Sequence, residues 1–457
     1  MAASILTTLL VPKVLGVEGF GYWQLFIMYC MYSQFFMLGQ FDGVYLKEGG
    51  KLREELDRRE VNTQYAICVV SQSLVGAIIA LVSVFVIPNG ARLFVFCSFG
   101  LYTALSNMAL ALGYVFQAIN ETRTFSRSVM IDRGLFIALL LVLLVLGVDD
   151  FRPYIVFYLC SKACSLVYCW FSARDLFNAG YTRLYEALAS CADNIRVGIH
   201  VAIATIADTL ILGIARMTID ASWGIEVFGS VSFALSMINF FTAFVGQACV
   251  VLFPALRRSS SDELKRIYVS LRDGLEAFFP IIYLLYYPAV FLLMLWLPQY
   301  QGSIRYFAML LPVCVFDSKM NICSGTYMKV LRKERAILVA NCLAVASSVV
   351  TSLIGAAVIH CLDFVILGVT FCILARSTFS ELWLDRQIGV RFSRLMVGEM
   401  VLTAIFLITS LSMGAPTGFF IYLIALSVFI FIYRSTIGSL IVGVCQLGKG
   451  LNVRQIG

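Results

Sequence analysis

The stretch QYAICVVSQSLVGAIIALVSVFVI, residues 64–87, decides the fold class. It contains no charged residue, and it is longer than the roughly 20 residues that a helix needs to cross a bilayer. The chain of 457 residues is 60% hydrophobic, above the roughly 45–50% that is usual for a soluble domain. Because backbone groups find no water in a bilayer, and runs this long do not alternate like barrel strands, we expect an all-α polytopic membrane protein.

Charged and proline-containing breaks divide the chain into fourteen apolar segments. These are 1–12, 20–40, 64–87, 93–119, 129–148, 153–173, 195–214, 224–253, 274–297, 303–328, 336–357, 361–383, 395–413 and 417–440. We therefore expect about 14 transmembrane helices. The first segment is too short to span, so helix 1 is expected to be truncated or to begin upstream of Met1.

Basic residues test this topology independently, because cytoplasmic loops carry an excess of Lys and Arg. If the N-terminus is inside, 27 of the 34 Lys and Arg residues lie in inner loops or toward the inner ends of apolar segments, and 5 lie on the outer side. The remaining 2, Lys162 and Lys319, lie near the middle of apolar segments. Both termini are therefore predicted to be cytoplasmic. The net charge of +7 is explained by these loops, so no nucleic-acid partner is expected.

The most charged of these loops, 41–60, has a counterpart 208 residues later. EELDR at 54–58 then aligns with DELKR at 262–266, and Phe20-Gly21 aligns with Phe228-Gly229. The shift preserves helix orientation. It predicts two parallel six-helix lobes around a central cavity, followed by a C-terminal helix pair.

The predicted organisation follows from this repeat. It comprises an N-terminal lobe at 1–173, a cytoplasmic linker at 174–194, a C-terminal lobe at 195–383, helices 13 and 14 at 395–440 and a cytoplasmic tail at 441–457. Within 262–272, apolar residues recur with helical spacing, which predicts a short helix lying on the inner membrane surface.

Several motifs resemble a known family. LLVPKVLGVEGFGYWQLFIMYC (9–30), followed by LGQFDGVYLKEGGKLREEL (38–56), resembles the start of bacterial O-antigen-type polysaccharide flippases. These belong to the multidrug/oligosaccharidyl-lipid/polysaccharide exporter (MOP) superfamily. ADTLILGIARMTIDASWGIEVFGSVSFA (207–234) is similar to that family's seventh helix and following turn, and YMKVLRKERA (327–336) to the exit of its tenth helix.

The resemblance implies a flippase that moves a polyprenyl diphosphate-linked oligosaccharide across the bacterial cytoplasmic membrane by alternating access of two lobes. The expected partners are this glycan, membrane lipids, and the polysaccharide polymerase and glycosyltransferases of surface polysaccharide synthesis. No cofactor, metal or enzymatic activity is expected. Such a flippase needs cations for the diphosphate and aromatic or amide groups for the sugars.

Ionisable residues within membrane helices are the candidate site residues, because burying them is costly. Lys162 lies near the middle of YIVFYLCSKACSLVYCW, where its side chain cannot easily reach an interface. Tyr158 and Ser165 share its helix face. Two interpretations stay open for Lys162, which are contact with the diphosphate and a structural pair with a neighbouring helix.

Asp317 and Lys319 lie near the middle of the tenth segment. Because they are two residues apart, they point in nearly opposite directions and are not expected to pair with each other. Asn321 continues the Asp317 face. This face is a candidate for the cavity, with structural bonding as the alternative.

Two further candidates lie in the seventh segment. Asp208 is an acid that could bind a coupling proton or sodium ion, or form hydrogen bonds within the bundle. Arg196 lies near the predicted cytoplasmic entry, where it could make a first phosphate contact or act as an ordinary positive-inside anchor.

Two other functions compete with the flippase. An ion-coupled exporter of small organic molecules from the same superfamily would be expected to line its cavity with acids, whereas Lys162 and Lys319 favour an anionic cargo. A membrane enzyme would need catalytic residues on a sizeable outer loop, and every predicted outer loop is short. No phosphate-binding glycine loop or metal-ligand cluster occurs in the sequence.

Overall fold

The computed structural model describes residues 6–257 and 261–438, and every regular element within those residues is a helix. The predicted tail at 441–457 and the first five residues of the predicted segment 1–12 lie outside this part of the chain. The helices form two compact units, Met1–Gly213 and Ile214–Gly457. The all-α prediction is confirmed.

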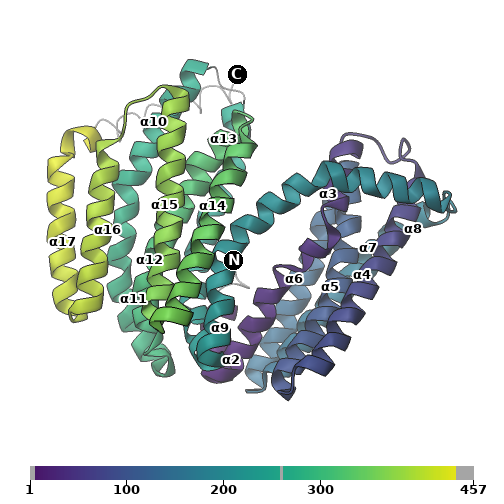
Figure 1. Ribbon diagram of the computed structural model, residues 1–457, viewed down its shortest axis with the longest axis horizontal. Helices are drawn as coiled ribbons and strands as arrows, with labels where there is room; N and C mark the ends of the chain where they lie inside the picture. Colours follow the sequence, from purple (N-terminus) through teal and green to yellow (C-terminus); the bar gives the residue numbers. More distant parts are fainter. Residues whose placement is uncertain (1–5, 258–260, 439–457) are drawn as a thin grey trace. The chain divides into compact units, whose positions relative to one another are not determined.

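Unit 1 is built on a bundle of long helices that run side by side in Figure 1. Its helices are α2 (Val11–Cys30), α3 (Gln40–Glu48), α4 (Arg58–Val86), α5 (Gly90–Ala118), α6 (Thr122–Val145), α7 (Phe151–Ser172) and α8 (Arg174–Phe177). The start of α9 (Leu184–Arg257) also belongs to this unit, and its remainder belongs to unit 2.

Unit 2 continues with shorter helices. They are α10 (Ser261–Phe278), α11 (Ile282–Trp296), α12 (Ser303–Lys319), α13 (Thr326–Val330), α14 (Glu334–Leu353), α15 (Leu362–Ile388), α16 (Arg394–Ser412) and α17 (Ala415–Ile432). A π-helical segment, Met320–Gly325, joins α12 to α13. The last two helices, α16 and α17, lie against each other.

Eleven helical stretches within the described residues are long and apolar enough to span a membrane, against about 14 predicted. One of them, Leu184–Asn239, has 56 residues. At 1.5 Å per residue a helix of that length would measure about 84 Å, more than twice the thickness of the hydrocarbon core. It covers the predicted segment 195–214 and the first part of 224–253, and non-helical backbone at Gly224 separates these two parts.

Two glycines mark equivalent kinks in α2 and α9. Gly16 has φ 68° and ψ −173°, and Gly224 has φ 81° and ψ −178°. Only glycine adopts such angles readily, because it lacks a Cβ atom. The two positions are 208 residues apart, the same shift that aligns the predicted repeats. The matching kinks support two repeated halves.

Side-chain caps explain where several helices begin. Asp57 accepts hydrogen bonds from the backbone N–H groups of Arg59 and Glu60 at the start of α4. Asn89 does the same at the start of α5, directly after Pro88, and Asp150 does so at the start of α7. Each cap satisfies N–H groups that lack a partner within the helix, and this fixes the point at which an apolar run becomes helical.

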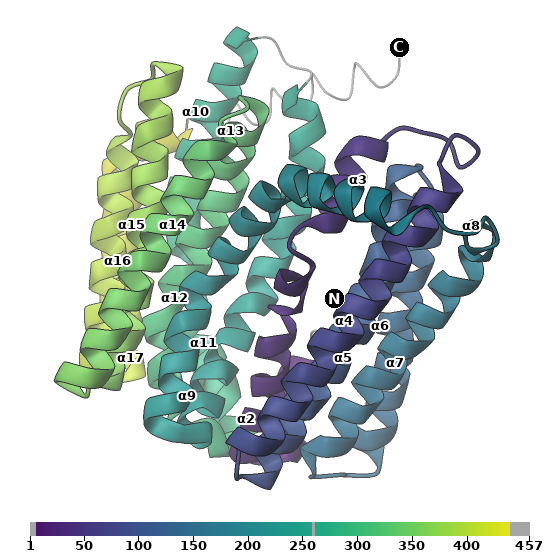
Figure 2. The ribbon, with the colours of Figure 1, turned by 45° about the vertical axis from the view of Figure 1, so that its right-hand side comes forward.

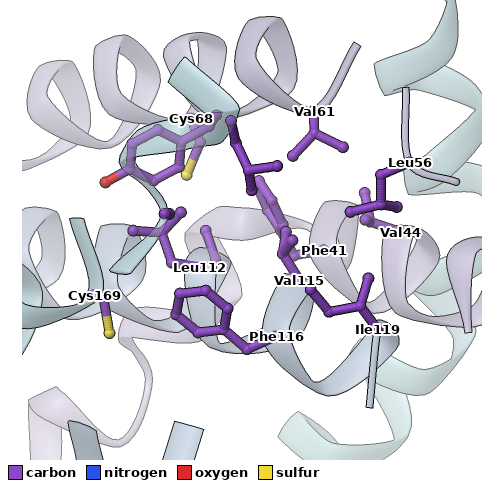
Figure 3. Close-up of a cluster of buried hydrophobic side chains, with 14 of the residues drawn as sticks. Phe41, Val44, Leu56, Val61, Cys68, Leu112, Val115, Phe116, Ile119 and Cys169 are labelled. Atoms are coloured by element: carbon purple, nitrogen blue, oxygen red, sulfur yellow. The ribbon is translucent and has the colours of Figure 1, made fainter. Parts of the chain in front are cut away.

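The charged loop 41–60 is anchored to unit 1 by Arg53. Its guanidinium donates to both oxygens of Glu121, at 2.8 and 2.7 Å, and to Asp175, at 2.6 and 3.1 Å. The hydrogen bond from Arg53 holds the pKa of the Asp175 carboxyl below its usual value. Beneath this loop lies a buried apolar cluster that includes Phe41 and Phe116, shown in Figure 3. The charge therefore ties three chain segments together at one end of the bundle.

The start of α9 crosses α3 at backbone contact distance, as Figure 2 shows. A Cβ atom on Gly43 would lie 2.0 Å from the Asn194 carbonyl oxygen, and one on Gly198 would lie 2.0 Å from the Gly39 carbonyl oxygen. Glycine is required at both positions for this close approach. The crossing attaches the region around the predicted linker 174–194 to unit 1.

The predicted surface helix at 262–272 forms the first part of α10 instead. Tyr268 is fully buried, and it packs with Tyr327 and Leu384 in an apolar cluster of unit 2. Leu264 and Ile267 pack against the same cluster. The apolar face predicted for 262–272 is present in the structure. It packs against apolar residues of α13 and α15 and not against a membrane surface.

Candidate functional site

Lys162 of α7 forms an ion pair with Asp132 of the neighbouring α6. The Nζ atom lies 2.6 Å from Asp132 Oδ2, and the Ser161 hydroxyl donates to Oδ1 at 3.2 Å. The Lys162 side chain is 16% exposed and that of Asp132 is 8% exposed. The pair is balanced in charge, and the lysine is not fully buried.

Aromatic rings surround this pair. Nζ of Lys162 lies 5.9 Å from the centroid of the Tyr102 ring, within the range of a cation–π contact. Tyr158, one turn before Lys162, contacts the rings of Tyr102, Trp23 and Phe136. Four helices, α2, α5, α6 and α7, contribute these rings.

Lys319 of α12 lies among three carboxylates from three different helices. Its Nζ atom is 3.0 Å from Glu276 of α10, 2.7 Å from Glu381 of α15 and 2.7 Å from Glu399 of α16. We call these four residues the Lys319 cluster. Lys319 is 2% exposed and the glutamates are 0–1% exposed, so the cluster is sealed within unit 2.

The polypeptide around the Lys319 cluster departs from regular α-helix. Pro312 lies within α12, and the π-helical segment begins directly after Lys319. Proline removes a backbone hydrogen bond, and single π turns occur often at functional sites. The cluster therefore lies where the helix geometry is least regular.

A second buried network adjoins the Lys319 cluster along α10 and α15. Arg272 bonds to Asp385 at 2.8 Å and to its neighbour Asp273, and the Tyr268 hydroxyl donates to Asp385 at 2.8 Å. Here two carboxylates share one guanidinium. The excess of acids over bases in the Lys319 cluster is thus not offset by this neighbour.

Asp317 points away from Lys319, as predicted. It pairs with Arg376 of α15, which also donates to Asn341 of α14 at 3.1 Å. Asn321 donates to Asp317 at 3.1 Å, which confirms that the two residues share a face. The Asp317 side chain is 26% exposed, so this face is more open than the Lys319 cluster.

Arg196 and Asp208 both lie on exposed faces of α9 within unit 1. Substrate or ion contact by Arg196, Asp208, Lys162, Lys319, Asp317 or Asn321 stays a prediction. For Lys319, such contact would require the sealed cluster to open.

The sequence analysis did not identify the acids that pair with Lys162 and Lys319, although their positions in apolar segments could have indicated them. Asp132, Glu276, Glu381 and Glu399 all lie near the ends of predicted apolar segments. Counting only Lys and Arg for topology left these acids out. Each is as unusual within a membrane helix as the lysine that it contacts.

No group of three His, Cys, Asp or Glu side chains within the described residues is arranged to hold a metal ion. The Lys319 cluster contains three glutamates, but the lysine ammonium occupies the position between them. Its chemistry is that of proton and charge balance.

No protein-family model matches the sequence, and no curated protein matches it. Two solved structures have a similar fold. One is the inward-facing conformation of a multidrug resistance MATE family transporter of the MOP superfamily, 13% identical with a TM-score of 0.61, covering 84% of this chain and 94% of that chain. The other is the lipid II flippase MurJ in an inward closed conformation, 11% identical with a TM-score of 0.60, covering 95% of this chain and 98% of that chain.

Both structures match this chain over nearly their whole length, and each has a helical membrane fold of the kind predicted from the sequence. The chain is a multi-pass integral membrane protein whose fold is similar to those of these two proteins.

Proposed function

We propose that this protein is a flippase that moves a polyprenyl diphosphate-linked oligosaccharide across the bacterial cytoplasmic membrane for surface polysaccharide synthesis. The observation that carries the proposal is the match to the lipid II flippase, which extends over 95% of this chain, against 84% for the MATE transporter. The difference is about 50 residues. That is more than the length of the C-terminal helix pair α16–α17.

A flippase must provide a polar path for the charged headgroup of its substrate through the membrane. An isolated charge would cost tens of kcal/mol in hydrocarbon by the Born estimate. Lys162 is the best candidate to meet the diphosphate, because it is partly exposed and the aromatic ring of Tyr102 lies 5.9 Å from its Nζ atom. Asp132 would neutralise Lys162 while no substrate is bound.

The more open face of unit 2 and the exposed face of α9 in unit 1 supply further candidates. Asp317 and Asn321 could hydrogen-bond sugar hydroxyls, and Arg196 on the exposed face of α9 could make a first phosphate contact. Alternating access would arise from rocking of the two repeated units. Polysaccharide polymerase and glycosyltransferases are the proposed partners on either side of this step.

The first test measures lipid-linked oligosaccharide on the cytoplasmic side of a strain that lacks the gene. The strain is complemented with wild type, Lys162→Ala or Lys51→Ala at matched membrane levels. We expect accumulation in the null strain, clearance by wild type and Lys51→Ala, and failure with Lys162→Ala. Absence of accumulation in the null strain would exclude the flippase.

An exporter of small organic cations is the second candidate. It is favoured by the carboxylates that the structure places against both lysines, since acids suit a cationic cargo. It predicts that the null strain becomes sensitive to cationic dyes without accumulating oligosaccharide. Dye efflux by the wild-type protein in vesicles would then identify it as an exporter and exclude the flippase proposal.

A further inference from the structure

The Lys319 cluster has a charge imbalance. One ammonium group faces the carboxyl groups of Glu276, Glu381 and Glu399, all of them buried. If every group were ionised, the cluster would carry two excess negative charges away from water. Uncompensated buried charge costs several kcal/mol even after the protein relaxes, and a carboxyl group normally avoids this cost by taking up a proton.

Hydrogen bonding identifies which carboxyl group takes it up. Lys319 donates to Glu276 and Glu399, and Ser393 donates to the second oxygen of Glu276. Glu381 lies 2.7 Å from Lys319, yet neither of its oxygens has a hydrogen-bond partner of acceptable geometry, and one oxygen of Glu399 also lacks a partner. Such buried orphan oxygens are rare in folded proteins.

A proton on Glu381 would give its unpartnered carboxyl group a way to form a hydrogen bond. The Glu276 and Glu381 carboxyl groups converge on the same ammonium nitrogen, at 3.0 and 2.7 Å from Lys319 Nζ. Two ionised carboxylates can only accept, whereas a protonated one gains an O–H donor. With one proton between them, Glu381 donates to Glu276, and the excess negative charge falls by one.

Among the residues that the structure describes, no other group around the cluster is shown to supply the missing positive charge. Its ionisable or polar neighbours are Arg272 and Asp273 of α10, Tyr283 of α11, Cys323 of the π-helical segment, Asp385 of α15 and Ser393 before α16. Arg272 is already shared by two aspartates. The surroundings therefore add negative charge to the cluster.

We propose that Glu381, with Glu276 and Lys319, forms a proton-binding site within unit 2, with a proton held on Glu381 at neutral pH and donated to Glu276. The bound proton holds α10, α12 and α15 together at one point. Removing it at alkaline pH restores the second excess negative charge and weakens that junction. This site is independent of the cargo.

Infrared spectroscopy of the purified protein in lipid nanodiscs tests the site directly, because a protonated carboxyl group has a carbonyl band separate from that of a carboxylate. At near-neutral pH, the difference spectrum between wild type and Glu381→Gln is expected to show the loss of one such band. The matched control is Asp132→Asn, in which the carboxylate belongs to the balanced pair with Lys162. It is expected to leave the band unchanged.

Thermal unfolding in detergent provides a second measurement. The wild-type unfolding temperature is expected to fall as the pH rises from neutral to alkaline, because the proton is lost from the folded state. Glu381→Gln, whose amide is neutral and similar in shape to a protonated carboxyl group, is expected to fold and to lose this pH dependence.

Three results would overturn the proton site. These are an absence of the protonated carboxyl band in wild type, an equal band in wild type and Glu381→Gln, or a failure of Glu381→Gln to fold. None of them bears on flipping, so the proton site and the transport proposal can fail separately.

Discussion

The two units each place one lysine among helices, but they balance its charge differently. In unit 1, Lys162 meets one carboxylate, and the pair is partly exposed. In unit 2, Lys319 meets three carboxylates and is sealed. The first lysine keeps some exposure beside its single partner, whereas the second is enclosed with its three acids.

The comparison shows that an intramembrane lysine does not by itself indicate an anionic cargo. Its meaning depends on the number of carboxylates that surround it and on its access to water. Lys162 has the access and balance suited to a substrate contact. Lys319 has the excess acid suited to holding a proton.

The largest expected effect is at Lys319. Lys319→Met would leave three buried carboxylates without a cation, and breaking a buried ion pair typically costs about 3–5 kcal/mol. We expect little folded protein, measured by size-exclusion chromatography and thermal unfolding in detergent. Adding Glu276→Gln, Glu381→Gln and Glu399→Gln to this variant should restore folding, since no charged side chain would remain in the Lys319 cluster. If Lys319→Met alone were as stable as wild type, the predicted cost of uncompensated buried carboxylates would be contradicted.

A smaller effect is expected in unit 1. Asp132→Leu would leave Lys162 without its carboxylate, but partial exposure and the Tyr102 ring reduce the loss to about 1–3 kcal/mol. The unfolding temperature of the purified protein measures it. The double variant Asp132→Lys with Lys162→Asp should recover part of the stability. A loss as large as that of Lys319→Met would remove the distinction between the two sites.

A third effect concerns the Arg53 anchor, which is 26% exposed. Arg53→Ala is expected to cost about 1–2 kcal/mol by removing charged hydrogen bonds to Glu121 and Asp175. Because Arg53 lowers the pKa of folded Asp175, the stabilisation is present above the usual aspartate value of about 3.9 and is lost as the pH falls through the folded value.

Unfolding temperatures of wild type and Asp175→Asn, measured from neutral to acidic pH, check this dependence. The gap between them should be constant near neutrality and close at acidic pH. A gap that widened on acidification would reverse the predicted sign.

The smallest effect is expected at Lys51, whose ion pair with Glu48 lies at the surface, with 44% of the lysine side chain exposed. Lys51→Ala should change stability by no more than about 0.5 kcal/mol, because water screens such a pair. The same thermal assay measures it. A larger loss would show that burial does not explain the ranking of these sites.

Much of the fold could be predicted because it depends on local features. The charge-free run at 64–87 lies almost entirely within α4, and the 208-residue shift corresponds to the paired kinks at Gly16 and Gly224. The opposite directions of Asp317 and Lys319 followed from helix geometry alone.

The partners of the candidate residues could not be predicted in this way. Asp132 is 30 residues from Lys162 in sequence, and Glu399 is 80 residues from Lys319. Which helices become neighbours, and at which depth, depends on packing between segments whose apolar surfaces look alike in sequence.

The sequence by itself determined a helical membrane protein, the approximate positions of its spans and the presence of a repeat, because hydrophobicity and helical period act over neighbouring residues. Only the tertiary structure decided that one lysine is balanced and the other is surrounded by an excess of acid. Burial and long-range contacts set the cost of a charge, and both exist only after helices distant in sequence pack together.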